Sequence, residues 1–305
     1  MPPHRTVAPP SAAAFVLVCL ASGAAADLDG CATAPARHAP APERTIRIDT
    51  PEGVIAGTLA APANAAPVAL ALLLHGFTGA RDEIPVEGRE GMFARAARAF
   101  AERGVASLRI DFRGSGESAG RWADTTFTGQ ARDALRAGAA LTENAEAPLV
   151  ALGYSQGGLV ALRAAAMDDV FERIALWNPV LDPRATYGLI LGVETLALGA
   201  VRHEAGARDD LVGASGLKPA FFADIASADP LADAARTDAP VLVVTGRRDH
   251  LVRDGAAFAD RIAAGRVAET QIVDLEAGHD LGAASDAALL DEVIACTAAF
   301  LLGVR

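Results

Sequence analysis

The stretch 149–162 constrains the fold of this chain more than any other, because it predicts a strand, a sharp turn and a helix in immediate succession. An apolar run ends at Gly153, Ser155 follows, and Gly157 and Gly158 precede a segment of alanine and leucine with helical periodicity. A serine in the pattern G-x-S-x-G at such a turn projects its hydroxyl above the edge of a sheet, and the glycines let the strand and the helix approach closely. Ser155 is therefore the candidate nucleophile.

The segments on either side of this turn alternate between predicted strands and predicted helices. Continuous apolar runs predict buried strands, and amphipathic segments between them predict crossover helices of a mainly parallel sheet. The expected strands, after an antiparallel hairpin at 45–49 and 54–60, are 68–74, 105–110, 149–153, 174–177, 241–245 and 271–275. The expected helices are 90–103, 128–143, 156–167, 256–264 and 287–302. We expect the α/β class: a mostly parallel twisted sheet with helices on both faces.

One interval, 178–240, breaks this alternation, because it contains no evident strand. Three short helical patterns fit there, at 189–201, 217–226 and 230–235. We expect a small helical cap inserted at about 182–238, above the C-terminal edge of the sheet, where it would shape a pocket over the serine. The alternative is an ordinary long connection packed beside the sheet.

The N-terminus has the pattern of an export signal. A short basic region at His4 and Arg5 precedes an apolar segment at 12–20, which is too short to span a bilayer, and three alanines at 24–26 offer a cleavage site. We expect export to the periplasm or the exterior, with no integral membrane span in the mature chain. The expected organisation is a signal peptide at 1–26, an Ala/Pro-rich spacer at 27–42 and a folded domain at 43–305.

The cysteines leave an alternative open for this N-terminus. Cys31 could carry a lipid anchor, although Asp29 places a charge where a lipobox usually has a small apolar residue. Cys31 could also pair with Cys296 in an exported protein. We expect Cys296 to be a buried free thiol, because it lies on an apolar helix face. No CxxC motif or His/Cys cluster indicates a metal.

Composition excludes some classes of partner. Hydrophobic residues make up 51% of 305 residues, which is ample for a large core, and the net charge of −11 disfavours nucleic acid or an anionic membrane as a partner. The net charge says nothing about a small ester or amide as the substrate. The oligomeric state cannot be predicted from these patterns.

A serine nucleophile needs a base, and the base needs an orienting carboxylate. With the chain order Ser, acid, His, the expected base is His279, in the loop after the last strand. Asp249 follows the preceding strand and is the expected acid, with Asp280 and Asp254 as its competitors. His250 is expected to be a surface or supporting residue.

The oxyanion hole needs two N–H donors. One is expected from the backbone of Gln156, the residue after the nucleophile, and the other from Phe77, in the loop after the strand 68–74. We expect His75 to brace this loop. In the glycine-rich segment 111–118 no lysine follows and no helix begins at once, so it is not a phosphate cradle, and its Asp111 and Arg113 are expected to brace the loop.

The chain resembles the α/β-hydrolase superfamily, because five motifs occur in the order and context that are typical of it. They are HGFTG at 75–79, DFRGSGES at 111–118, GYSQGG at 153–158, GRRD at 246–249 and AGH at 277–279. The resemblance covers about 45–303 and is strongest to bacterial cinnamoyl/feruloyl-esterase-like enzymes and serine aminopeptidase-like esterases. It implies the α/β-hydrolase fold with a small cap, a triad of Ser155, Asp249 and His279, oxyanion amides at Phe77 and Gln156, and no cofactor.

Two departures from that family pattern leave the substrate open. Tyr154 stands where many relatives have histidine, and Asp280 and Leu281 follow His279 in place of an aromatic residue. The expected activity is hydrolysis of a small-molecule carboxylic ester by a carboxylesterase-like serine hydrolase. The alternatives are a serine peptidase or amidase acting on short peptides, and a non-catalytic binding protein of the same fold.

Overall fold

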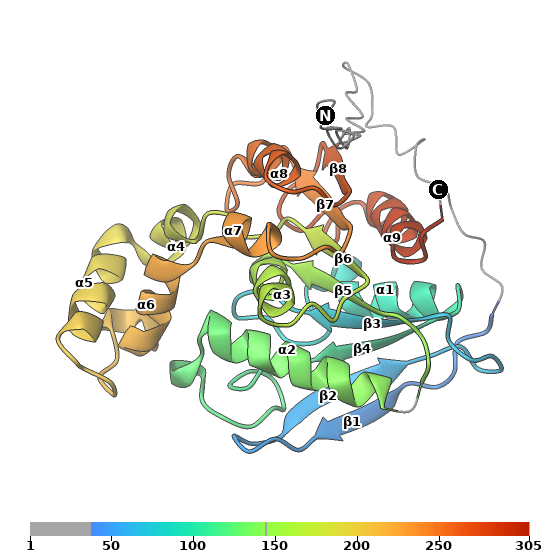
Figure 1. The fold of residues 1–305 in the computed structure, drawn as a ribbon, viewed down its shortest axis with the longest axis horizontal. Helices are drawn as coiled ribbons and strands as arrows, with labels where there is room; N and C mark the ends of the chain where they lie inside the picture. Colours follow the sequence, from blue (N-terminus) through green and yellow to red (C-terminus); the bar gives the residue numbers. More distant parts are fainter. Residues whose placement is uncertain (1–37, 144, 305) are drawn as a thin grey trace, which may run out of the picture.

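An eight-stranded sheet forms the centre of the molecule (Figure 1). The computed structural model describes residues 38–143 and 145–304, so the predicted signal peptide and most of the spacer lie outside the described residues. The strands are β1 (Arg44–Ile48), β2 (Ile55–Ala60), β3 (Ala69–Leu74), β4 (Val105–Ile110), β5 (Leu149–Tyr154), β6 (Arg173–Trp177), β7 (Val241–Gly246) and β8 (Thr270–Leu275).

The helices occur where amphipathic segments were expected. They are α1 (Met92–Ala101), α2 (Phe127–Thr142), α3 (Gln156–Met167), α4 (Pro183–Leu191), α5 (Val193–Glu204), α6 (Pro219–Ser227), α7 (Pro230–Ala234), α8 (Gly255–Ala264) and α9 (Ala287–Leu301). Short 3₁₀ turns, which periodicity does not predict, lie at Val86–Gly88, Trp122–Asp124 and Gly213–Ser215.

The order of the strands across the sheet is β1-β2-β4-β3-β5-β6-β7-β8. β1 and β2 form the expected antiparallel hairpin, β2 pairs antiparallel with β4, and all other pairs are parallel. The carboxyl ends of β3, β5, β6, β7 and β8 therefore lie at one edge of the sheet. Loops that follow these strands can meet above that edge.

Two cores cover the two faces of the sheet. Leu70, Leu72 and Leu74 pack with α2, α3 and α8, whereas the alternate residues of β3 pack with α1 and α9. This alternation follows from the two-residue period of a strand, and it explains why the buried strands are apolar throughout. The predicted fold class, a mostly parallel sheet with helices on both faces, is confirmed (Figure 1).

Four helices, α4 to α7, connect β6 to β7, and α4, α5 and α6 project to one side of the sheet (left in Figure 1). We refer to α4–α7 as the cap. The predicted single helix at 189–201 is wrong in detail, because the chain forms α4 and α5 with a break at Gly192, whose φ is 88°. Asp182 accepts a hydrogen bond from the Ala185 N–H and Pro183 occupies the first turn, so α4 begins earlier than its apolar pattern indicates.

Within residues 38–143 and 145–304 no single helix is long and apolar enough to cross a membrane; α4 and α5 meet that criterion only together, with a bend of 111° between them.

Cys296, on the buried face of α9, is disulfide-bonded, and its partner lies outside the described residues. The expectation of a free thiol at Cys296 is wrong, because an apolar helix face predicts burial of the sulfur but not its bonding state.

Candidate active site

Ser155 occupies the turn between β5 and α3 with a left-handed backbone, at φ 53° and ψ −118°. Such a conformation costs a residue with a side chain about 1–3 kcal/mol and persists where neighbouring structure holds it. Here the Ser155 N–H donates to the Trp177 carbonyl at 2.9 Å, and the Ser155 carbonyl accepts from Gly158 at 3.1 Å and Val180 at 3.0 Å. These backbone hydrogen bonds hold the serine in its turn.

The glycines of the motif are required by close packing of backbone on backbone. A Cβ at Gly157 would overlap the carbonyl of Leu74 at the end of β3, and a Cβ at Gly153 would lie 2.7 Å from the Cα of Gly158. Neither obstacle is a flexible side chain that could move aside. The G-x-S-x-G pattern therefore lets α3 begin directly against the sheet.

The structure brings Ser155, His279 and Asp249 together, although 124 residues separate the first two in sequence and 30 the last two. His279 Nε2 lies 3.0 Å from Ser155 Oγ, and His279 Nδ1 lies 2.6 Å from Asp249 Oδ2. With the proton on Nδ1, the imidazole donates to Asp249 and presents Nε2 as an acceptor to the serine hydroxyl. This is the arrangement that a serine nucleophile and its base require.

Asp249 is a fixed acceptor. Its side chain is 1% exposed, and its Oδ1 accepts from the backbone N–H groups of Leu251 at 2.8 Å and Val252 at 2.9 Å. Its Oδ2 is thereby left to His279. The turn after β7 thus supplies two donors that orient the carboxylate toward the imidazole.

The predicted competitors of Asp249 have other roles. Asp280 Oδ2 accepts from the Ala284 N–H at 2.8 Å, within the turns that lead to α9. Asp254 is exposed at the start of α8, and His250 is exposed beside Asp249. None of these three side chains has a hydrogen bond to the His279 ring among the described residues.

Asn178 holds the loop that carries His279, and its role was not predicted from the sequence. Its Nδ2 donates to the carbonyls of Gly278 at 3.1 Å and His279 at 2.9 Å, and its Oδ1 accepts from the Gly246 N–H at 2.7 Å. The Tyr154 hydroxyl also donates to the His279 carbonyl, at 3.2 Å. Asn178 follows β6 at the same sheet edge, and this position is the signal that could have identified it.

The two predicted oxyanion donors flank the serine. The Gln156 N–H is the first of α3, where an amide has no intrahelical acceptor and the helix dipole favours negative charge. Phe77 lies in the loop after β3 and lines the same cavity as Ser155 and His279. Both amides are therefore available at the edge of the sheet where the serine projects.

His75 is buried beneath this loop with both ring nitrogens engaged. Nδ1 donates to the Gly76 carbonyl at 2.8 Å, and Nε2 accepts from the Phe112 N–H at 3.1 Å. Burial lowers the pKa of the imidazole from 6.5 to about 4, so the ring is neutral at physiological pH. These contacts agree with the predicted bracing role of His75.

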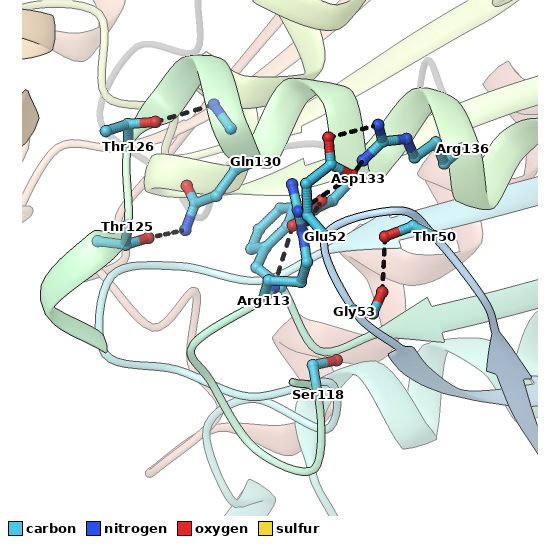
Figure 2. Close-up of polar contacts among 12 residues, drawn as sticks. Thr50, Glu52, Gly53, Arg113, Ser118, Thr125, Thr126, Gln130, Asp133 and Arg136 are labelled. Carbon is cyan, nitrogen blue, oxygen red and sulfur yellow. Dashed lines mark hydrogen bonds and ion pairs between the residues drawn. The ribbon is translucent and has the colours of Figure 1, made fainter. Parts of the chain in front are cut away.

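The segment 111–118 is also braced by its own polar residues, as predicted. The Asp111 carboxylate accepts from the Arg81 guanidinium at 2.5 Å, the Arg81 N–H at 2.8 Å and the Glu117 N–H at 2.9 Å. Arg113 Nε donates to Asp133 at 2.6 Å, and Figure 2 shows this pair beside Glu52 and Arg136. The segment is a structural loop in which each of these charges has a partner.

The side chain of Gln156 joins the elbow to two other elements. Its Nε2 donates to Gln130 Oε1 at 2.7 Å. Gln130 in turn donates to Thr125 at 3.2 Å, and Figure 2 shows this second hydrogen bond. Its Oε1 accepts from the hydroxyl of Tyr187, which lies on α4 in the cap. The cap is thus hydrogen-bonded to a residue that supplies an oxyanion donor.

A cavity of about 640 Å³ opens over the serine. The cap contributes Thr186 and Ile190, and Leu251 and Ile84 add further apolar surface. Among the described residues that line the cavity, Glu83 is the only carboxylate, and there is no lysine or arginine. The cavity suits a small, uncharged organic group.

Comparisons with known proteins agree with this fold. The family model described as serine aminopeptidase, S33, matches residues 65–205. Est1E from Butyrivibrio proteoclasticus, solved with bound ferulic acid, is 22% identical, with a TM-score of 0.65 over 85% of this chain and 98% of that one. The Pyrococcus furiosus esterase Pf2001 is 19% identical, with a TM-score of 0.60 over 85% and 91% of the two chains. No curated protein sequence matches. Likeness at these identities establishes a common fold.

Proposed function

We propose that this chain is a serine carboxylesterase of the α/β-hydrolase superfamily and that it hydrolyses small uncharged esters. The observation that carries this proposal is the continuous hydrogen-bond path from Ser155 Oγ through His279 to Asp249 at the floor of one cavity. Two backbone N–H groups at Phe77 and Gln156 complete the set of groups that acyl transfer needs.

The proposed reaction has two halves. In the first, Ser155 Oγ attacks the ester carbonyl while His279 Nε2 accepts the hydroxyl proton, and the developing oxyanion is stabilised by the amides of Phe77 and Gln156. The tetrahedral intermediate collapses, His279 returns the proton to the leaving alkoxide, and an acyl-serine remains. In the second half, water gives a proton to His279 and attacks the acyl carbonyl. As the second tetrahedral intermediate collapses, His279 returns that proton to Ser155 Oγ, which releases the acid and restores the serine hydroxyl.

The cavity lining supports the choice of substrate class. Phe77, Ile84, Ile190 and Leu251 provide apolar surface for an acyl or alcohol group. No lysine or arginine lines the cavity among the described residues, so a carboxylate on the substrate would have no permanent cation as a partner there, and Glu83 would repel it. Neutral acyl groups are therefore favoured over anionic ones.

A second candidate is hydrolysis of short peptides or amides, because the matching family model carries the description serine aminopeptidase. An amine leaving group must be protonated by His279 before it departs. A panel of p-nitrophenyl esters with short acyl and long acyl chains, feruloyl esters and aminoacyl p-nitroanilides separates the candidates. The proposal predicts that esters are cleaved with kcat/KM at least about 100-fold above the anilides; the reverse order would establish the peptidase.

We propose export of the mature chain as well, on the N-terminal pattern of a basic region, an apolar segment at 12–20 and alanines at 24–26. Fractionation of cells that express the full chain, with mass determination of the product, tests it. Export predicts a periplasmic or secreted product that begins near Asp27. A lipid-modified N-terminus at Cys31 would support the anchored alternative.

A further inference from the structure

Glu83 lies in the loop between β3 and α1, and the reaction described above makes no use of it. It is half-buried and lines the cavity together with Ser155 and His279. Its backbone is left-handed, at φ 59°, and its N–H donates to the Ala80 carbonyl at 2.9 Å. The turn thereby directs the carboxylate back beneath the segment 76–79.

The carboxylate contacts the loop that carries the predicted oxyanion donor. Glu83 Oε1 accepts from the Gly76 N–H, and the N–H of Ile84 also hydrogen-bonds to the carboxylate. A Cβ at Gly79 would lie 2.7 Å from Glu83 Oε1, and a Cβ at Gly76 would lie 3.3 Å from both Glu83 Oε1 and Ser155 Cβ. Both glycines of the HGFTG motif therefore make room for this carboxylate, and one of them separates it from the nucleophile.

Hydrogen bonds fix both the N–H and the carbonyl of Gly76. Its N–H is bound by Glu83, and its carbonyl accepts from His75 Nδ1 at 2.8 Å and from the Gly79 N–H at 3.2 Å. A peptide unit is planar, so the direction of the Gly76 carbonyl sets the direction of the Phe77 N–H. Because glycine itself has wide conformational freedom, the angle between the two peptide units depends on these hydrogen bonds.

We propose that Glu83 is a positioning residue of the oxyanion hole, whose carboxylate holds the Gly76 peptide so that the Phe77 N–H is directed at the reacting carbonyl. The proposal rests on the proposed serine hydrolase function. It assigns to Glu83 no contact with the reacting atoms.

The electrostatic surroundings of Glu83 agree with this role. Tyr154, from β5, and His279, from the loop after β8, are the titratable groups that line the cavity with it. On its own loop, Arg81 pairs with Asp111 and Glu117, and Asp82 pairs with Arg109. No cation therefore pairs with Glu83 among the described residues, and backbone N–H groups are its partners.

Ionisation of Glu83 is accordingly sensitive to its environment. Burial raises the pKa of its carboxyl to about 7, against the effect of the two backbone N–H groups, which favour the charged form. A side chain that serves only to fill space would not need a carboxylate at this place. Glutamine, which keeps the shape and an acceptor oxygen, is therefore the informative replacement.

The test compares Glu83→Ala, Glu83→Gln and the control Glu87→Gln, which changes an exposed carboxylate of the same segment outside the cavity lining. Steady-state kinetics on p-nitrophenyl butyrate and the rate of labelling by a fluorophosphonate are measured for each. We expect Glu83→Ala to lower kcat and the labelling rate at least about 10-fold with KM changed less than about 3-fold, because loss of one oxyanion donor costs about 10²–10³ in turnover. Glu83→Gln is expected to recover most of that loss, and Glu87→Gln to match the parent chain.

A variant that does not depend on removal of Glu83 guards against misfolding. Gly79→Ala places a methyl group against the Glu83 carboxylate and should lower kcat in the same way. In the Glu83→Ala background, Gly79→Ala should cause no further loss. A parent-like kcat in both Glu83→Ala and Gly79→Ala, or a Glu83→Gln variant as slow as Glu83→Ala, would overturn the proposal.

Ser155→Ala, measured in parallel, separates this inference from the function on which it rests. If Ser155→Ala is inactive while Glu83→Ala has a parent-like kcat, only the role of Glu83 fails. If Ser155→Ala keeps its activity, the serine mechanism fails, and the role of Glu83 fails with it.

Discussion

Tyr187, on α4 of the cap, donates a hydrogen bond from its hydroxyl to the side chain of Gln156 at the start of α3. The same ring packs edge-on against Phe77 with 5.2 Å between the ring centroids. One buried side chain of the cap thus contacts both residues whose amides are the predicted oxyanion donors. The position of the cap and the geometry of the oxyanion hole are therefore linked through Tyr187.

Tyr187→Phe tests this link. The substitution removes the hydroxyl and leaves the buried Oε1 of Gln156 without that donor, so we expect a loss of about 1–3 kcal/mol in the free energy of unfolding. Urea unfolding measures it, in a double-mutant cycle with Gln156→Met, which keeps the backbone donor. A coupling energy of about 1 kcal/mol or more is expected, and additive effects of the two substitutions would contradict the link.

Asp249→Asn tests the assignment of the acid. An amide keeps one oxygen, which can accept from the Leu251 and Val252 N–H groups, but it then presents an NH₂ donor to His279 Nδ1 in place of Oδ2. This favours the wrong imidazole tautomer, so kcat should fall by about 10³–10⁴. Steady-state kinetics on p-nitrophenyl butyrate measure this loss. Asp254→Asn, at an exposed residue of the neighbouring turn, serves as the control and should retain parent activity. Equal losses of kcat in the two variants would contradict the assignment of Asp249 as the acid.

Glu83 makes the stability of the fold depend on pH. Its pKa is raised from 4.5 to about 7 in the folded chain, so the folded state binds more protons than the unfolded state between these values. Stability therefore falls as pH rises through this window, by up to about 3 kcal/mol for one group shifted by this amount. The stability that the protonated Glu83 carboxyl contributes is fully present below pH 4.5 and is lost above pH 7.

Urea unfolding of Glu83→Gln and the parent chain at pH 5 and pH 8 isolates this effect. The free energy of unfolding of Glu83→Gln minus that of the parent chain should be more positive at pH 8 than at pH 5. His75 has the opposite effect on stability. Its pKa is lowered from 6.5 to about 4, so the stability it contributes is lost as pH falls. Because His75 is present in both chains, its effect cancels in the comparison. A difference between the two chains that is independent of pH would contradict the raised pKa.

Gly157→Ala tests the steric reason for the motif. The new methyl group would collide with the carbonyl of Leu74, a backbone atom that cannot move without displacing β3. We expect a loss of several kcal/mol in stability, about 3 kcal/mol or more, or failure to fold. Gly188→Ala, where a Cβ meets only the Val193 side chain at 3.3 Å, is the matched control. Thermal melting compares the two variants, and Gly157→Ala should melt at a clearly lower temperature than Gly188→Ala. Similar melting temperatures would contradict the steric role of Gly157.

The sequence predicted most of the sheet because its buried strands are short apolar runs bounded by turns. The segments at 68–74, 105–110 and 149–153 each became a strand within one residue of the expected bounds. Parallel strands between helices also placed the loops with Ser155, Asp249 and His279 at one edge. For these three residues the signal was local, since each lies within four residues of the end of a strand.

The features that the sequence did not predict depend on contacts between distant segments. Asn178 forms hydrogen bonds to backbone carbonyls of a loop about 100 residues away, and Glu83 bonds to the Gly76 N–H within its own irregular loop; neither contact leaves a periodic pattern. Tyr187 had no distinguishing neighbours in sequence, and its role arises where α4 meets α3. The break at Gly192 was missed because apolar residues continue on both sides of it, so periodicity alone predicted one helix.

The central claim is that Ser155 is the nucleophile of an ester hydrolase. The most direct measurement is the intact mass of the chain after exposure to a fluorophosphonate, with peptide mapping, together with turnover of p-nitrophenyl butyrate by the parent chain and by Ser155→Ala. The account predicts one equivalent of label on the peptide that contains Ser155, and neither label nor turnover in the folded Ser155→Ala variant. Label on another residue, or turnover that persists in Ser155→Ala, would contradict it.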